Sequence, residues 1–444
     1  MTQLPARVLV CGFGRTGQAV TRVLAARGVA VRVVDQRDAD TLGIDADRWA
    51  SAELALGTTL DDPLAAVDLV VPSPGVPPEA AVLAAARRRD VPIASEIEVA
   101  FGLLDCPVLA ITGTNGKSTT TTLVGVALET SGQRTFVGGN LGTPLIAAVD
   151  GRFDVAVAEV SSFQLEWVRR FRPAVGAVLN VSPDHLDRHG SFEAYRAMKG
   201  RLFAAQRETD VAVANHDDPE ALALGLDAPG RLLTFGRAAR GQGVFGHGDE
   251  IVCRMDEHEE RYGLTRTRLI GAHNRENVMA AVVIARCAGA SPSAVQHAID
   301  TVAPLPHRLA LVTERAGVRW YDDSKATNVA AVVKSLESFG GPVVLLAGGV
   351  DKGGDYGPLG AAIRGKARVT LVFGQAGPRI GAALEQAGIP VRAVASLDAA
   401  VEAAASAARA GDAVLLAPAC SSFDMFTDYA ARGRAFRAAV EGLG

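Results

Sequence analysis

Short apolar runs alternate with longer mixed segments along the first hundred residues. Runs of strand length occur at 8–11, 31–35 and 68–71, and a helical pattern up to about residue 27 separates the first two. Strands that alternate with helices are typical of βαβ units in a parallel sheet. The same alternation predicts further strands at 153–160, 174–181, 210–214, 343–347, 369–373 and 413–417.

The apolar pattern changes after Arg231, where glycines break it into shorter runs. We expect strands at 244–245, 251–253 and 264–270, forming an antiparallel flank. A Pro-Leu-Pro segment at 304–306 indicates a boundary. The 444 residues suit about three domains. We therefore predict three α/β domains with mainly parallel sheets.

Composition excludes several classes of protein. The net charge of −4 gives no basic excess for nucleic acids or anionic membranes. The five cysteines are scattered and lack Cys-x-x-Cys spacing, which indicates free thiols in a reducing compartment. A glycine breaks the first apolar run too early for a signal peptide, and no apolar stretch reaches membrane-spanning length. We expect a cytoplasmic protein that neither inserts into membranes nor binds nucleic acid.

The segment Leu109-Ala-Ile-Thr-Gly-Thr-Asn-Gly-Lys-Ser-Thr119 carries the strongest chemical signal. An apolar strand enters a glycine turn, and a helix follows, so backbone N–H groups can surround a phosphate. Lys117 can reach the β- and γ-phosphates, and the Ser118 hydroxyl can bind Mg²⁺. Ile111 stands where the strict P-loop motif has its first glycine. The order of strand, turn and helix predicts a nucleotide site.

A second glycine loop, Gly12-Phe-Gly-Arg-Thr-Gly17, follows the first predicted strand. Asp35 lies 18 residues past its last glycine, as in the fingerprint of dinucleotide-binding folds. That motif alone is weak, because several kinds of phosphate site use it. The proline-rich segment 72–78 follows another strand and is either a ligand loop or a connector.

Acidic residues and histidines follow the next predicted strands. Glu159 ends an apolar strand, where a P-loop protein places a carboxylate that organises Mg²⁺. Asp184, His185, Asp187 and His189 lie within six residues, and such groups suit Mg²⁺. The alternatives are a solvated strand-end glutamate and ordinary helix capping. Lys199 by itself is a solvated helix lysine.

The C-terminal segment carries three polar loops after predicted strands, at 321–328, 348–354 and 418–424. Loops that follow parallel strands meet at one edge of a sheet, so together they predict a ligand surface. His307 and Arg308 follow the proline boundary, and Arg308 could bring a guanidinium to a phosphate.

Taken together, these sequence motifs resemble those of the Mur ligases of bacterial peptidoglycan synthesis, and the resemblance covers essentially the whole chain. Gly-Thr-Asn-Gly-Lys-Ser at 113–118 is shared with the similar folylpolyglutamate synthases. The segments 159–166, 182–189, 322–328 and 417–424 are more typical of the glutamate-adding Mur ligases. The resemblance implies a UDP-binding Rossmann-like domain at 1–97, a central P-loop ATPase-like domain at 98–304 and a C-terminal Rossmann-like domain at 305–444.

The resemblance also implies residue roles. ATP and its phosphates would be bound by Gly113, Thr114, Asn115, Gly116, Lys117, Ser118, Thr119, Asn274, Asn277, Arg308, Asp323 and Lys325. Mg²⁺ would be bound by Ser118, Glu159, His185 and Lys199, the last as a carbamylated lysine. The residues implied in catalysis are Lys117, His185, Lys199, Arg308 and Lys325.

Substrate contacts are implied by the same resemblance. The UDP substrate would be held by Arg15, Thr16, Asp35, Arg37, Ser73, Pro74, Gly75, Asn140 and Ser161. The glutamate pocket would contain Thr327, Lys352, Ser422 and Tyr429. Tyr429 stands where the family pattern has Phe, and Arg15 is larger than the usual apolar residue.

The implied reaction joins D-glutamate to UDP-N-acetylmuramoyl-L-alanine by way of an acyl phosphate made from ATP, in an enzyme expected to be a monomer. Three alternatives stay open from the sequence. One is a related ligase that adds L-glutamate or acts on folate. Another is an NAD-dependent oxidoreductase, which residues 12–17 and Asp35 support but which leaves the loop at 113–118 without a role. A P-loop module that hydrolyses ATP without ligation would leave the third domain unexplained.

Overall fold

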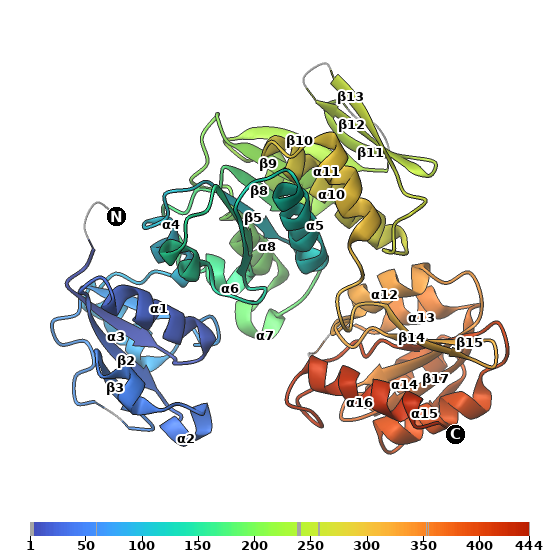
Figure 1. Cartoon of the computed structure of the whole chain (residues 1–444). Coiled ribbons are helices and arrows are strands. Elements are labelled where there is room, and N and C mark those ends of the chain that lie inside the picture. The colour runs from blue at the N-terminus through green and yellow to red at the C-terminus, as the bar shows by residue number, and fades with distance from the viewer. Residues whose placement is uncertain are drawn as a thin grey trace. The chain divides into compact units, whose positions relative to one another are not determined.

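The computed structural model describes residues 4–58, 60–237, 241–255, 258–351, 353 and 355–443. Contacts divide the chain into two compact units. The first contains residues up to 181, 193–265 and 277–299, and the second contains 182–192, 266–276 and 300 onward. Three separate sheets account for the strands (Figure 1). In the described part of the chain, no helix combines the length and the apolar character needed to cross a bilayer.

The N-terminal sheet has four parallel strands in the order β3-β2-β1-β4. They are β1 (Arg7–Cys11), β2 (Ala30–Asp35), β3 (Ala52–Leu56) and β4 (Leu69–Pro72). The helices of this segment are α1 (Arg15–Ala25), α2 (Ala39–Leu42), the 3-10 turn η1 (Ala46–Trp49) and α3 (Ala81–Arg88). Because β1 and β4 are neighbours, the loops that follow them meet at the strand ends, where open α/β sheets bind ligands.

The central sheet has nine strands in the order β13-β12-β11-β10-β9-β8-β5-β7-β6. They are β5 (Val108–Thr112), β6 (Thr135–Gly139), β7 (Val155–Glu159), β8 (Val175–Val178), β9 (Val211–Asn215), β10 (Arg231–Gly236), β11 (Gly243–His247), β12 (Glu250–Met255) and β13 (His258–Gly263). The strands from β6 to β11 pair in parallel, and β11, β12 and β13 are antiparallel. Figure 1 shows these last three as a yellow-green ribbon at one end of the sheet. β5 lies between β7 and β8, so the loops after these three strands are adjacent.

Helices accompany the central strands, as the predicted alternation requires. They are α4 (Glu96–Phe101), α5 (Lys117–Thr130), the 3-10 helix η2 (Leu145–Asp150), α6 (Ser162–Leu165), α7 (Leu186–His189), α8 (Phe192–Gly200), α9 (Pro219–Leu226), α10 (Ala272–Cys287) and α11 (Pro292–Thr301). All five residues of β5 and of β7 are buried. Strands covered on both faces read as continuous apolar runs, which is why the sequence revealed them.

The C-terminal sheet has six strands in the order β14-β15-β19-β16-β17-β18, and only β14 is antiparallel. They are β14 (Ala310–Arg315), β15 (Val318–Asp322), β16 (Val343–Gly348), β17 (Ala367–Phe373), β18 (Val391–Ala393) and β19 (Ala413–Leu416). The helices are α12 (Val329–Glu337), α13 (Gly357–Ile363), α14 (Gly377–Gln386), α15 (Leu397–Ala407) and α16 (Tyr429–Glu441).

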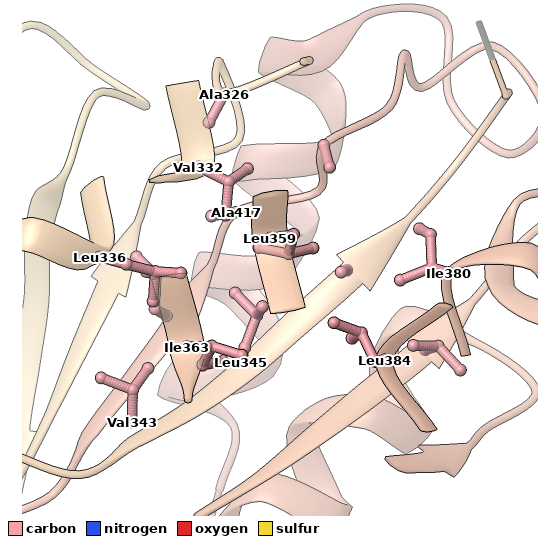
Figure 2. Close-up of a cluster of buried hydrophobic side chains, with 14 of the residues drawn as sticks. Ala326, Val332, Leu336, Val343, Leu345, Leu359, Ile363, Ile380, Leu384 and Ala417 are labelled. Atoms are coloured by element: carbon pink, nitrogen blue, oxygen red, sulfur yellow. The ribbon is translucent and has the colours of Figure 1, made fainter. Parts of the chain in front are cut away.

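An apolar core fixes this third sheet against its helices. Leu336 of α12, Ile363 of α13 and Leu384 of α14 gather around Leu345 of β16, and all four are fully buried (Figure 2). Burying a leucine or isoleucine side chain stabilises a fold by roughly 1.5–3 kcal/mol. This core places the ends of β15, β19 and β16 side by side.

The predicted antiparallel flank is confirmed by β11, β12 and β13, but one of its three strands was misplaced. β11, which contains the expected strand at 244–245, pairs in parallel with β10 and antiparallel only with β12. Residues 264–270 form no strand, and the third flank strand is β13. The charged sequence of β13 concealed it, because an edge strand can expose polar side chains while a single residue, Tyr262, is buried against the core.

Candidate active site

The glycine loop at 113–116 joins β5 to α5 and adopts the conformation that a phosphate cradle requires. Gly113 and Gly116 have φ of +154° and +86°, values that favour glycine. A Cβ at Gly116 would lie 2.1 Å from Asn277 Oδ1. Gly116 is also the N-cap of α5, so the helix begins at the loop and directs its N–H groups there. Both glycines are therefore required for this turn.

Lys117 folds back over the loop. Its Nζ donates to the carbonyls of Gly113 at 2.8 Å and Thr114 at 2.9 Å. The ammonium thus lies over the loop that would hold the phosphates. Asn180, which follows β8, fixes the same loop from the other side: its Oδ1 accepts from Asn115 N at 2.8 Å and its Nδ2 donates to Asn115 O at 3.1 Å.

Glu159, at the end of β7, connects the first turn of α5 to the loop that follows β6. Its Oε2 accepts a 2.5 Å hydrogen bond from Ser118 Oγ, and its Oε1 accepts from Asn140 Nδ2 at 2.6 Å. Glu159 is only 3% exposed. The structure therefore brings together Ser118 and Glu159, which two separate motifs predicted, and Asn140, which the resemblance alone implied. Ser161 is the N-cap of α6 in a capping box with Gln164.

Lys199 is almost completely buried, with 1% exposure. Its Nζ donates to Gly113 O at 2.9 Å and lies 4.5 Å from the centre of the Tyr195 ring. The Tyr195 hydroxyl is 3.1 Å from Thr114 Oγ1. A lysine amine is rarely buried so deeply without a specific role. The solvated reading of Lys199 is thus wrong, and the residue lies directly under the glycine loop.

The N-terminal site surrounds the ends of β1, β2 and β4. Asp35 accepts hydrogen bonds from Phe13 N at 2.7 Å and from Arg37 Nη2 at 2.8 Å. Burial acts to raise the pKa of Asp35, but the Arg37 guanidinium and the backbone amides outweigh it and lower the pKa to about 2. Ser73 Oγ donates to Gly12 O at 2.9 Å. Asp35 thus braces the glycine loop and orients Arg37.

The remaining predicted residues of this segment lie around the same strand ends. Arg15 begins α1, and its Nη1 donates to Gly142 O at 2.9 Å. Thr16 follows it in α1. Pro74 and Gly75 form the turn after β4, which is closed by a 2.9 Å hydrogen bond from Val76 N to Ser73 O.

In the second unit, a strained turn presents Arg308. His307 and Leu309 have φ of +63° and +48°, and this backbone region costs energy in residues other than glycine. Asp322 lies 2.6 Å from His307 Nδ1, and Asp323 Oδ1 accepts from Leu309 N at 3.0 Å. The two carboxylates thus hold the turn on both sides of Arg308.

Burial raises the pKa of Asp323 to about 7, although hydrogen bonds from Ser335 and Leu309 and the charge of Arg308 oppose the shift. Lys325 Nζ lies 3.8 Å from the centre of the Tyr429 ring. Such a cation–π contact needs only the aromatic ring, so a Phe at position 429 could make it as well as Tyr429 does. Thr327 N donates to Lys325 O at 2.8 Å, and Ser422 is 2% exposed.

The three polar loops of the second unit converge on Arg432, which is fully buried in α16. Its guanidinium donates to the carbonyls of Ser324, Gly348 and Cys420 at 2.9, 3.3 and 3.1 Å, one from each loop. Burial lowers the pKa of Arg432 to about 10. Arg432 therefore holds the loops in position without being in any of them.

The roles of the metal-binding and ligand-binding residues, Lys352 and His185 among them, stay sequence predictions. Lys352 lies outside the described residues. His185 begins the turn before α7 in the second unit, with φ of +53°. Among the described residues, no group of three or more His, Cys, Asp or Glu side chains could hold a metal ion.

Asn274 and Asn277, on α10, are 7% and 6% exposed.

Comparison with known proteins decides the family. Models of the Mur ligase MurD-like N-terminal domain, the Mur ligase middle domain and the Mur ligase glutamate ligase domain match residues 6–95, 111–285 and 307–420. The chain is 45% identical over 447 residues to the UDP-N-acetylmuramoylalanine--D-glutamate ligase of Syntrophus aciditrophicus, covering 98% of this chain and 97% of the relative. The chain belongs to the Mur ligase family. It is also 44% identical to the protein of the same name from Geobacter metallireducens, with the same coverage.

Solved structures confirm the predicted three-domain α/β fold of this Mur ligase. The UDP-N-acetylmuramate-alanine ligase of Thermotoga maritima aligns with a TM-score of 0.60 at 20% identity, covering 98% of this chain and 99% of that chain. The MurF ligase of the same organism, solved in complex with ADP, aligns with a TM-score of 0.59 at 17% identity, covering 98% and 95%. The domain boundaries at 97 and 304 stay predictions.

Sequence reasoning missed three residues that shape the Mur ligase site. Asn180 and Tyr195 contact the glycine loop, and Arg432 joins the loops of the third sheet. Asn180 lies at the end of the strand predicted at 174–181 and just after β8 as observed, and a polar residue at that strand end was a usable signal. Arg432 gave none, because an arginine in an amphipathic helix is ordinarily exposed.

Proposed function

We propose that this Mur ligase joins D-glutamate to UDP-N-acetylmuramoyl-L-alanine and converts ATP to ADP and phosphate, in the synthesis of peptidoglycan precursors. The observation that carries this proposal is the match to UDP-N-acetylmuramoylalanine--D-glutamate ligases over nearly the whole chain. The glycine loop, with Lys117 over it and α5 behind it, supports the use of ATP. Residues 12–17, with Asp35 and Arg37, are assigned to the UDP part of the substrate.

A carboxylate is a poor electrophile, so the alanine carboxylate first attacks the γ-phosphorus of ATP. The bond from this phosphorus to the bridging oxygen breaks, and ADP leaves. The glutamate amine then attacks the carbonyl carbon, loses a proton, and phosphate departs. Lys117 and Arg308 neutralise the charge on the transferring phosphoryl group, which is the main contribution that proteins make in such reactions.

The residues present suit a magnesium ion. Ser118 Oγ and Glu159 Oε2 are oxygen donors 2.5 Å apart, and Glu159 carries the negative charge that Mg²⁺ prefers. Bound there, Mg²⁺ would offset phosphate charge. Ser118, Glu159 and His185 are the proposed ligands. Lys199 joins them only as a carbamate, because an ammonium group offers no lone pair to a metal.

Carbamylation of Lys199 would add CO₂ to its neutral amine and release a proton. Its burial beside Gly113 O would protect the product from water. We expect the Lys199→Ala variant to lose ligation and to recover part of it when short carboxylic acids are added. Lys325→Ala serves as the control, since it should lose activity without any recovery. Full activity of unsupplemented Lys199→Ala would contradict the role.

The overall reaction is tested by phosphate release from ATP and UDP-N-acetylmuramoyl-L-alanine with each glutamate enantiomer. We expect release with D-glutamate, and little with L-glutamate or without amino acid. If L-glutamate proved the better substrate, the ligase function would stand and the stereochemical assignment would fall. Turnover of NAD with no release of phosphate would favour the oxidoreductase alternative.

A further inference from the structure

A cavity of about 500 Å³ opens between two segments that the proposed reaction does not use. One is 87–93, from the end of α3 toward α4, and the other is 166–169, which follows α6. Arg201, just after α8, completes the lining. No lining residue belongs to the glycine loops or to the polar loops of the third sheet. Its volume is in the range of small-molecule sites.

The walls of this cavity are fixed by buried polar contacts. The Glu98 carboxylate, on α4, accepts hydrogen bonds from the backbone amides of Arg169, Arg170 and Phe171 at 3.0, 3.0 and 2.8 Å. From the other side, Arg201 donates to Glu166 O at 3.0 Å and to Val168 O at 2.5 Å. The segment is thus held in place before any ligand arrives, which reduces the entropic cost of binding.

One side of the cavity is apolar and aromatic. Trp167 is half-buried and packs against the N-terminal core cluster that contains Ile93. The Arg87 guanidinium lies 5.0 Å from the centre of the indole ring. The flat apolar part of a ligand can lie against such a surface, while the Arg87 guanidinium lies near the polar end of the same ligand.

The charges favour an anion. Arg87, Arg169 and Arg201 line the cavity with Asp90 and Glu166. In the part of the chain that the structure describes, no carboxylate forms an ion pair with Arg87 or with the Arg169 side chain. Burial, and then the nearby charge of Arg169, lower the pKa of Arg201, although Glu166 and Glu98 oppose the shift. An anion between these guanidinium groups would relieve that repulsion.

We propose that this cavity binds an aromatic phosphate monoester or a ligand of the same chemistry. Its phosphate lies against Arg87 and Arg169, and its ring lies against Trp167 and Ile93. The ligand bridges the segment 87–93, which begins at the end of α3, and the segment 166–169, which follows α6. This binding site is independent of the proposed ligation.

The test follows Trp167 in the full-length protein labelled with 5-fluorotryptophan. The chain has three tryptophans, so the Trp167→Phe spectrum assigns the Trp167 fluorine resonance. Phenyl phosphate is the probe, and its two parts, inorganic phosphate and phenol, are titrated separately for comparison. We expect a saturable shift of the Trp167 resonance with phenyl phosphate, and affinities at least about tenfold weaker for either part alone.

Matched variants assign the contacts. Arg169→Ala should weaken phenyl phosphate binding by about tenfold, the loss expected for one charge-assisted contact. Arg88→Ala should change nothing, because Arg88 is an exposed neighbour of Arg87 that does not line the cavity. Lys117→Ala should bind the probe as the parent does, which separates this cavity from the P-loop.

Three results would overturn the proposal: no saturable shift of the Trp167 resonance, unchanged affinity in Arg169→Ala, or inorganic phosphate binding as tightly as phenyl phosphate. Because Arg87 packs over the indole ring, Arg87→Ala can move the resonance without ligand, and Arg169→Ala is therefore the decisive variant. A protein that binds phenyl phosphate but shows no ligase activity would refute the proposed function alone. A protein that shows ligase activity but does not bind phenyl phosphate would refute this site alone.

Discussion

A buried glutamate makes the stability of the first unit depend on pH. Glu96 begins α4 and is only 1% exposed, and its Oε1 accepts a 2.6 Å hydrogen bond from Ile146 N in η2. Burial raises the pKa of Glu96 from 4.5 to about 7, although the Ile146 amide and the Gln164 side chain oppose the shift. The folded state thus holds this proton more tightly than the unfolded state.

The sign of the pH dependence follows from that difference. Below about pH 4.5 Glu96 is protonated in both the folded and the unfolded state, so its ionisation does not lower the free energy of unfolding. As pH rises toward 7, the unfolded state loses its proton first, so the free energy of unfolding falls. Above pH 7 the full penalty applies, on the order of 3 kcal/mol at about 1.4 kcal/mol per pKa unit. Glu96→Gln keeps the acceptor for Ile146 N and removes the charge, so it should stabilise the unit at pH 8 and be nearly neutral at pH 4.5.

Hydrogen exchange of the α4 and η2 amides measures this effect locally. Comparing variants at the same pH cancels the intrinsic pH dependence of exchange. Glu98→Gln is the matched control: the Glu98 carboxylate accepts three backbone amides, so its loss should destabilise the unit by roughly 1.5–3 kcal/mol at pH 8, the opposite sign to Glu96→Gln. Protection in Glu96→Gln that equals or falls below the parent at pH 8 would refute the reasoning.

Three further predictions follow from the glycine loops. Lys117→Ala should abolish ATP turnover while calorimetry shows unchanged affinity for the UDP substrate, because the N-terminal glycine loop is assigned to that substrate; equal loss of both would count against this division. Gly116→Ala places a Cβ 2.1 Å from Asn277 Oδ1 at a φ of +86°, so ATP affinity should fall by at least about tenfold. The circular dichroism spectrum should stay that of the parent, and unchanged ATP affinity would argue against the cradle. Asp35→Asn removes the charge that holds Arg37, so the dissociation constant of the UDP substrate should rise and that of ATP should not.

The sequence predicted the elements that are buried on both faces and the motifs at their ends. β5, β7 and β8 are short apolar runs, and their order along the chain placed Gly113, Glu159 and the loop of Asn180 near one another. Strands with mixed or polar sequences escaped prediction: β3, β6, β10, β14 and β18 were missed, and β13 was placed at 264–270. Most of these strands owe their place to pairing with neighbours rather than to their own composition.

The roles of single polar residues could be predicted only where a motif defined them. Lys117 and Ser118 follow from a motif, since backbone geometry and phosphate chemistry fix their positions. Lys199 has the composition of an ordinary helix lysine, and only the resemblance singled it out. Its burial beside Gly113 depends on the packing of α8, which the sequence pattern does not reveal.

Arg432 shows why part of such a site lies beyond motif reading. Most of the groups that it binds are backbone carbonyls, which every residue possesses, and its side-chain partner, the Ser324 hydroxyl, belongs to an ordinary loop serine, so no sequence motif marks the interaction. A buried guanidinium is costly unless its donors are satisfied, and here the loop carbonyls and the Ser324 hydroxyl accept from them. Those carbonyls are in place only when β15, β16 and β19 lie side by side. The loops and the arginine therefore depend on each other, and the ligand surface is a property of the folded sheet rather than of any one segment.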